Sequence, residues 1–225
     1  MLAIRCCARF HVSLDLGFVR VFRFCDDPTA NTSVGPVLHD TYLRTVVVPL
    51  LQAQYCANGG CPIDLIGFSK SGWGTTSLLL THPTTYRHGA AWDAPSMLSG
   101  AFCDWTQARG HTAAPWGMMP EFGSCNVWRK YSPYDLIPHA DPSFKSAAHP
   151  RLFVGGQHLF GDLPNNYPGS PGAPFNHTAE LHARLSTHGV AHRYNDSLDP
   201  GRHEWSAVWM APMLDWLRSA GSPTS

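Results

Sequence analysis

Residues 64–83 read DLIGFSKSGWGTTSLLLTHP, and this stretch decides the fold that the sequence predicts. A short apolar strand runs into Gly-Phe-Ser-Lys-Ser-Gly, and an apolar helix follows at once. In a nucleophile elbow, small residues stand two before and two after the nucleophile, because the strand and helix backbones nearly touch there. Gly67 and Ser71 meet that requirement around Ser69, whereas a turn centred on Ser71 would put Trp73 at a tight position. The spacing therefore predicts Ser69 as a serine nucleophile.

The same turn also has a purely structural interpretation. Ser residues cap helices, and Gly permits close packing where a strand meets a helix. Position 71 holds Ser where the motif usually has a second Gly. The elbow by itself is therefore evenly balanced between the two interpretations, and a catalytic role requires a base and an acid elsewhere in the chain.

Composition limits the classes of function. The chain has 225 residues, enough for a single domain with a substantial core. Sixteen Lys and Arg residues balance sixteen Asp and Glu residues without any basic run, which argues against a nucleic-acid or anionic-membrane surface. No apolar stretch approaches the roughly 20 residues that a membrane-spanning helix needs.

Cysteines, sequons and the N-terminus leave the compartment open. Arg5, Arg9 and His11 interrupt what would be the apolar core of a secretory signal. Cys56 and Cys61 bracket the turn CANGGC and can form a bridge, although buried free thiols fit the spacing equally. Three Asn-x-Ser/Thr sequons would matter only in a secreted protein. They begin at Asn31, Asn176 and Asn195.

Apolar patterning predicts strands that alternate with helices. The expected strands are 18–24, 63–68, 87–94, 151–156 and 190–198, and the expected helices are 40–55, 71–82, 178–189 and 204–220. Pro49 should kink the first helix or start a second segment there. The alternation predicts an α/β fold, with a mostly parallel sheet and helices on both of its faces.

We expect one domain, with its core over residues 18–218 and a polar tail at 219–225. Residues 97–149 interrupt the alternation, are rich in Trp, Gly and Pro, and are too long for an ordinary connection. Such insertions are often lids or binding loops, and a surface excursion without a role in binding is the alternative. Together with this lid-like insertion, Trp73 and Trp92 are candidates for lining an apolar substrate pocket.

A serine hydroxyl needs a base that removes its proton and, usually, a carboxylate that orients the base. His203 stands between the last predicted strand and the last helix, where the base of such a triad belongs. Asp162 is the only carboxylate between the strand at 151–156 and Glu180, which makes it the candidate acid. Asp93, at the end of the strand that follows the elbow helix, is the alternative acid.

Cofactor and metal chemistry find no support in the sequence. No Gly-rich phosphate-binding motif follows the first predicted strand. The histidine-rich stretch NHTAELHARLSTHGVAH contains no His-Glu-x-x-His, and Gly189 should end its helix. We therefore expect neither a cofactor nor a metal.

Four stretches together resemble the esterase D-like branch of the α/β-hydrolases. They are LIGFSKSGWGTTSLLLTHPTTYRHGAAWDAP, YSPYDL, RLFVGGQHLFGD and GRHEWSAVWMAPMLDWL. The resemblance implies a serine hydrolase of the carboxylesterase type that acts on a small-molecule ester through an acyl-enzyme. It gives Ser69 the role of nucleophile, His203 that of base and Asp162 that of orienting acid.

The N-terminal part departs from this pattern. In such enzymes the N–H that follows the nucleophile, here that of Lys70, is one oxyanion donor, and a loop after an earlier strand supplies the other. Residues 1–17 have no Gly before Gly17 and no His-Gly pair, so the first strands and that loop are expected to be missing or replaced. An N-terminally truncated fold should expose a sheet edge, which favours self-association. The alternative function is a catalytically impaired or dead hydrolase fold that serves as a binding domain.

Overall fold

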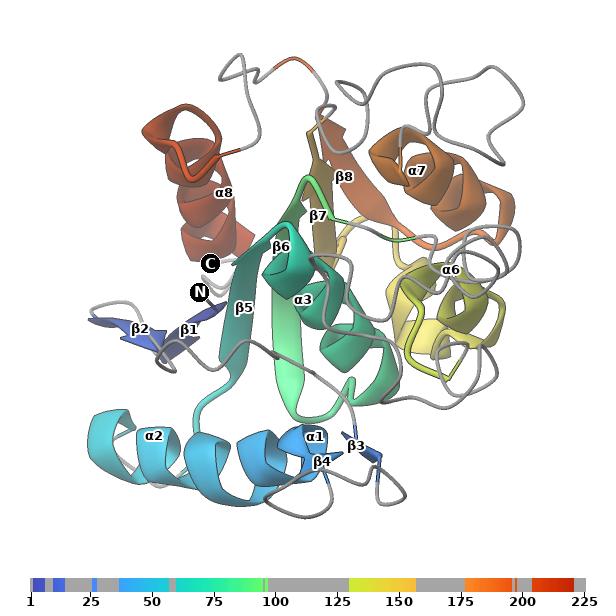
Figure 1. The fold of residues 1–225 in the computed structure, drawn as a ribbon. Helices are drawn as coiled ribbons and strands as arrows, with labels where there is room; N and C mark the ends of the chain where they lie inside the picture. Colours follow the sequence, from blue (N-terminus) through green and yellow to red (C-terminus); the bar gives the residue numbers. More distant parts are fainter. Residues whose placement is uncertain are drawn as a thin grey trace, which may run out of the picture.

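The computed structural model describes residues 2–6, 10–14, 26–27, 37–56, 60–94, 96, 130–156, 177–195, 197 and 204–220. A six-stranded sheet in the order β2-β1-β5-β6-β7-β8 lies at its centre (Figure 1). These strands are β1 (Leu2–Cys6), β2 (Phe10–Leu14), β5 (Ile63–Phe68), β6 (Tyr86–Trp92), β7 (Leu152–Gly155) and β8 (His192–Asn195). A separate small sheet pairs β3 (Asp26–Asp27) with β4 (Val37–Leu38).

Helices surround the sheet. The longer ones are α2 (Val48–Tyr55), α3 (Lys70–Thr81), α7 (His177–Thr187) and α8 (Ala207–Ala220). The short ones are α1 (His39–Tyr42), the π-helix η1 (Leu43–Val47), α6 (Pro133–Leu136) and the 3₁₀ helices η2 (Ile137–His139) and η3 (Pro142–Lys145). No helix within the described ranges is both long and apolar enough to cross a membrane.

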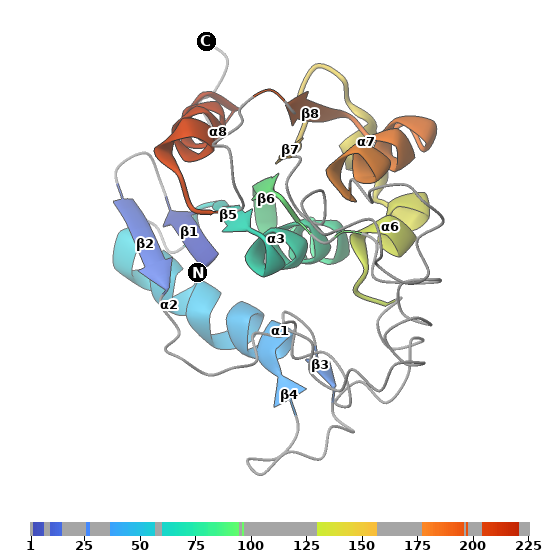
Figure 2. The same cartoon turned by 45° about the horizontal axis from the view of Figure 1, so that its top comes forward.

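Strands β5, β6, β7 and β8 run parallel to one another, which confirms the predicted parallel sheet. Successive residues of a strand point to opposite faces, so Leu65 and Ile66 enter different cores. On one face Leu65 packs in a core that includes Leu79 of α3 and Leu185 of α7. On the other face Ile66 packs in a core with Trp209 of α8. Figure 2 shows α3 and α8 on opposite sides of the sheet. Helices thus cover both faces, as the alternation of elements predicted.

The predicted helix at 40–55 is continuous, but its winding changes just before its proline. α1 continues through the π-helical turn η1 into α2, where Pro49 stands in the first turn. Proline has no N–H to donate to the preceding turn, and it fits best where that donor would be unpaired anyway. The α-helical segment α2 starts at Val48, one residue before the proline, and the backbone angles stay helical across the junction, so the chain changes its winding there without leaving the helix.

The edge of β5, which missing early strands would leave exposed, is covered by two N-terminal strands. β1 pairs antiparallel with β5, with Ile4 opposite Leu65, and β2 pairs antiparallel with β1. Apolar and polar residues alternate in FHVSL (10–14), a pattern typical of a strand that was available in the sequence. The predicted strand at 18–24 lies outside the described residues. Self-association through a sheet edge stays a prediction, and the edges of this sheet are β2 and β8.

The end of the predicted insertion belongs to the packed structure. Residues 97–129 lie outside the described ranges, whereas residues 130–149, the end of the predicted insertion, are described. Ile137 and Phe144 are each only 1% exposed, and the Ala191 N–H donates to the Phe144 carbonyl over 2.7 Å. Earlier in the chain, Cys56 and Cys61 form a disulfide with Cα atoms 5.5 Å apart, which decides between the two interpretations of CANGGC.

Candidate active site

Ser69 occupies a strained turn between β5 and α3. Its backbone angles are φ 55° and ψ −124°, close to the first central position of a type II′ turn, which favours glycine. The Ser69 N–H donates to the carbonyl of Trp92 over 2.8 Å, which ties the turn to the neighbouring strand β6. A non-glycine residue keeps such angles only where its surroundings impose them, at about 1–3 kcal/mol.

Gly67 and Ser71 provide those surroundings. A Cβ atom at Gly67 would lie 2.2 Å from the Ser71 carbonyl oxygen and 2.4 Å from its carbonyl carbon, so only glycine fits. The Ser71 hydroxyl donates to the Phe68 carbonyl over 2.8 Å and accepts from the Phe68 N–H over 2.9 Å. The close approach of positions 67 and 71 confirms the spacing argument, and the serine at 71 ties the helix to the end of the strand.

Lys70 is the first residue of α3. The first N–H groups of a helix have no acceptor within it, so the Lys70 N–H has no partner inside α3. This backbone group lies directly after Ser69, at the helix end whose partial positive charge favours anions. Its position is compatible with the predicted oxyanion donor.

Asp93 lies at the end of β6, next to the turn of Ser69. It is fully buried, its φ is 47°, and its N–H donates to the Gly155 carbonyl over 2.9 Å. A Cβ atom at Gly156 would lie 2.1 Å from Asp93 Oδ1, so glycine at 156 makes room for this carboxylate. In the described part of the chain, Ser69 and Asp93 are the non-glycine residues with positive φ, and both directly follow parallel strands of one sheet.

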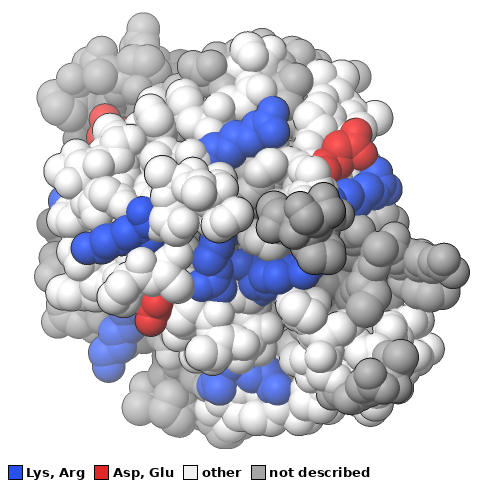
Figure 3. Space-filling view, turned by 180° about the vertical axis from the view of Figure 1, so that it is seen from behind, with Lys and Arg blue, Asp and Glu red and all other residues white. Residues whose placement is uncertain are grey.

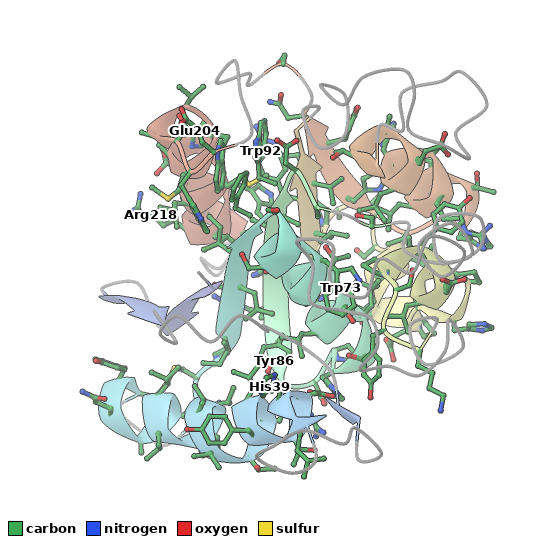
Figure 4. All side chains as sticks on the ribbon, in the orientation of Figure 1. His39, Trp73, Tyr86, Trp92, Glu204 and Arg218 are labelled. Carbon is green, nitrogen blue, oxygen red and sulfur yellow. A yellow bond between two sulfur atoms is a disulfide. The ribbon has the colours of Figure 1, made fainter. Side chains whose placement is uncertain are left out.

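His203 and Asp162 lie outside the described residues. The described chain resumes directly after His203, and the Trp205 ring lies 5.4 Å from the ring of Phe68, which directly precedes Ser69. Figure 4 shows Glu204 and Trp92 at the same end of the molecule. The segment next to His203 is therefore held against the strand end that carries Ser69, and the positions of the two side chains stay predictions.

Trp73 and Trp92 are both buried. Trp73 is 3% exposed, and it belongs to the core of α3 and α7. Trp92 is fully buried and stacks on Trp209 with ring centroids 5.6 Å apart and ring planes 2° apart. Both rings thus fill cores in the described structure, and a contact with substrate stays a prediction.

The structure pairs two of the histidines from the histidine-rich stretch. His192 donates through Nδ1 to the Val190 carbonyl over 2.8 Å, so its Nε2 accepts from His182 Nδ1 over 2.7 Å. Burial lowers the pKa of His192. The pair joins α7 to β8, and the described residues contain no group of three or more potential metal ligands.

Comparisons with known proteins concern the fold. No protein-family model matches the chain, and no curated protein matches its sequence. MPT51 (FbpC1) of Mycobacterium tuberculosis is similar in structure, with a TM-score of 0.52 and 16% identity, over 80% of this chain and 66% of that one. An S-formylglutathione hydrolase from Agrobacterium tumefaciens is similar with a TM-score of 0.51 and 12% identity, over 85% of this chain and 61% of that one.

The chain thus spans less than two thirds of the length of either structure. At such low identity the likeness extends to the fold and not to the activity. Together with the parallel sheet, the helices on both faces and the turn at Ser69, it confirms the fold that the sequence resemblance implied. The chain has the α/β-hydrolase fold.

Proposed function

We propose that this protein hydrolyses carboxylic esters through an acyl-enzyme formed on Ser69. The observation that carries the proposal is the positive φ of Ser69 at the junction of β5 and α3. Glycine would occupy this position without strain, so a serine held there by the close contact of Gly67 with Ser71 points to a use for its hydroxyl.

The proposed reaction proceeds in two steps. His203 takes the proton of Ser69 Oγ, which attacks the acyl carbon, and the Lys70 N–H donates to the oxyanion. The tetrahedral intermediate breaks its bond to the alkoxy group, which leaves as an alcohol with the proton from His203. Water, deprotonated by the same imidazole, then attacks the acyl-enzyme; the bond between the acyl carbon and Ser69 Oγ breaks, the carboxylic acid leaves, and the imidazolium returns its proton to Ser69 Oγ.

Asp162 is proposed to orient His203, and Asp93 is the alternative. Asp162 follows Gly156 by six residues, so an extended chain would allow Asp162 to lie up to about 20 Å from Gly156. Asp93 already lies at the correct edge of the sheet, buried beside Gly156. Substituting each aspartate by asparagine distinguishes the two candidates, because only loss of the acid that holds the imidazole should lower kcat by about 10⁴.

A fluorophosphonate probe tests the proposal. We expect labelling of the wild type and of Ser71→Gly, which restores the usual residue of the motif, and no labelling of Ser69→Ala. Hydrolysis of p-nitrophenyl acetate should follow the same order. Equal labelling of wild type and Ser69→Ala would exclude Ser69 as the nucleophile. A folded wild type that is neither labelled nor active would favour the binding-domain alternative.

A further inference from the structure

A hollow of about 630 Å³ lies at the end of the sheet opposite Ser69. It is bordered by residues at the starts of parallel strands, including Tyr86, the first residue of β6, and Arg151, which directly precedes β7. Ser69 follows the other end of β5. Figure 4 shows Tyr86 at one end of the molecule and Trp92, which ends the same strand, at the other. The hollow is therefore separate from the proposed ester site.

Among the residues that the structure describes, three arginines and no carboxylate line this hollow. They are Arg44, Arg87 and Arg151. On the back of the molecule, Lys and Arg side chains gather near the middle with few acidic ones among them (Figure 3). The remaining lining offers neutral hydrogen-bonding groups, among them Gln52 and Thr84. The surface of the hollow is thus suited to a negatively charged ligand.

Arg151 is held in place by neutral acceptors alone. Its Nη2 donates to the carbonyls of Pro83 and Tyr86, each over 2.6 Å, and its Nε donates to the Arg87 carbonyl over 2.8 Å. Its Nη1 donates to the Ser143 hydroxyl over 2.8 Å. Among the described residues it makes no ion pair, and burial lowers its pKa. A positive charge without a paired carboxylate therefore borders the hollow.

Arg87 is fixed by a buried carboxylate behind it. It binds Asp64 through Nε over 3.0 Å and through Nη2 over 2.7 Å, and His88 binds the same carboxylate over 3.0 Å. Burial raises the pKa of Asp64, but the hydrogen bonds from His88 and Arg87 outweigh it, so the pKa lies below its ordinary value. Asp64 is 1% exposed and does not line the hollow. The guanidinium is thus the charged group that the hollow presents here.

Arg44, in η1, is likewise anchored by a buried aspartate that also contacts a histidine. Its Nε donates to Asp40 over 2.9 Å, and His82 contacts the other oxygen of the same carboxylate over 2.7 Å. Asp40 is 5% exposed and does not line the hollow, whereas the Arg44 side chain is 31% exposed. This contact uses one of the five N–H donors of the guanidinium, so the Nη groups are available to a ligand.

We propose that this hollow binds a small organic anion with at least two negative charges, through Arg44, Arg87 and Arg151. The Nη groups of Arg44 can donate paired hydrogen bonds to a carboxylate or phosphate, whereas Arg151, which already donates four of its five N–H groups, adds one N–H and its positive charge. All three side chains are already anchored, so little side-chain freedom is lost on binding. The volume lies within the range of about 300–1,000 Å³ that small-molecule sites have, which exceeds the need of a single inorganic ion. The two carboxylates behind the arginines keep them in place without entering the hollow.

Titration calorimetry with pyrophosphate and with citrate, at fixed ionic strength, tests this site. We expect saturable binding of at least one anion in the millimolar range or tighter, with one site per chain. Arg44→Gln should weaken it about 10-fold, because a charge-assisted hydrogen bond contributes about 1.5 kcal/mol or more. The matched control is Arg218→Gln, since Arg218 also pairs with an aspartate one turn earlier on its helix, far from the hollow.

A second pair of variants leaves the Asp40 contacts intact. Thr84 is exposed at the hollow, so Thr84→Asp adds a negative charge there and should abolish binding. Thr187→Asp, on the exposed side of α7, should not. Binding of pyrophosphate alone identifies a phosphate ligand, and binding of citrate alone a carboxylate ligand. Absence of saturable binding to both, or equal affinities of the Thr84→Asp and Thr187→Asp proteins, would overturn the proposal whatever the activity of Ser69.

Discussion

Substituting Gly67 with alanine tests the turn on which the site depends. The new Cβ atom would lie 2.2 and 2.4 Å from the Ser71 carbonyl oxygen and carbon, where ordinary contacts are 3.4–4 Å. Both neighbours are backbone atoms in the first turn of α3, so strand and helix must separate by more than about 1 Å. Overpacking of a core usually destabilises by about 1–3 kcal/mol, and we expect the upper end, about 3 kcal/mol.

Two other glycines calibrate this measurement. At Gly60 a Cβ atom would meet nothing within 4 Å, so Gly60→Ala should stay within about 0.5 kcal/mol of wild type. At Gly189 the space is equally open but φ is 67°, so alanine there should destabilise by about 1 kcal/mol through the backbone alone. Comparing the three variants separates a steric clash from the loss of conformational freedom that glycine provides.

Urea unfolding followed by circular dichroism gives the three free energies, provided that the m-values agree. In thermal unfolding, Gly67→Ala should lower Tm by about 6–12 °C, because 1 kcal/mol corresponds to about 2–4 °C in a chain of this size. If Gly67→Ala destabilises no more than Gly189→Ala, the strand and the helix do not approach as described, and the argument for a strained Ser69 fails with it.

Three further predictions concern strain and protonation. Ser69→Gly should be about 1 kcal/mol more stable than Ser69→Ala in urea, because glycine accepts a φ of 55° without strain; equal stabilities would contradict that strain. The lowered pKa of His192 means that its stabilising effect is present above pH 6.5 and is lost as the pH falls. His192→Gln should therefore reduce the change of Tm between pH 7 and pH 5, whereas substitution of the exposed His139 by glutamine should leave that change as in wild type. The lowered pKa of Asp64 means that its contribution is present above pH 3.8 and is lost below it, so the stability of Asp64→Asn should change less than that of wild type on acidification below pH 4.

Local patterns predicted the parallel part of the fold well. The strand at 63–68 has the expected bounds, and α3 begins one residue before the predicted helix. These elements carry strong local signals, since a buried apolar run, a small-residue turn and a helical repeat follow one another directly. The contact of position 67 with position 71 was predictable for the same reason, because both belong to one turn.

Long-range pairing was not predictable in the same way. The strands at 2–6 and 10–14 are short, and the first of them joins the sheet by pairing with β5, which lies roughly 60 residues further along the chain. The burial of Trp92 against Trp209 of α8 has the same origin. A tryptophan near a predicted site suits a pocket or a core equally, and only the packing of a distant helix decides between them.

The sequence by itself determined that a serine would stand in a tight turn between a buried strand and a helix, because small residues at 67 and 71 permit no wider connection. The tertiary structure alone decided that Asp93 is buried beside that turn and that three arginines, at positions 44, 87 and 151, border one hollow. Their proximity depends on the order of parallel strands in the sheet. Strand order is fixed by contacts between segments far apart in the sequence, and local sequence patterns do not indicate such contacts.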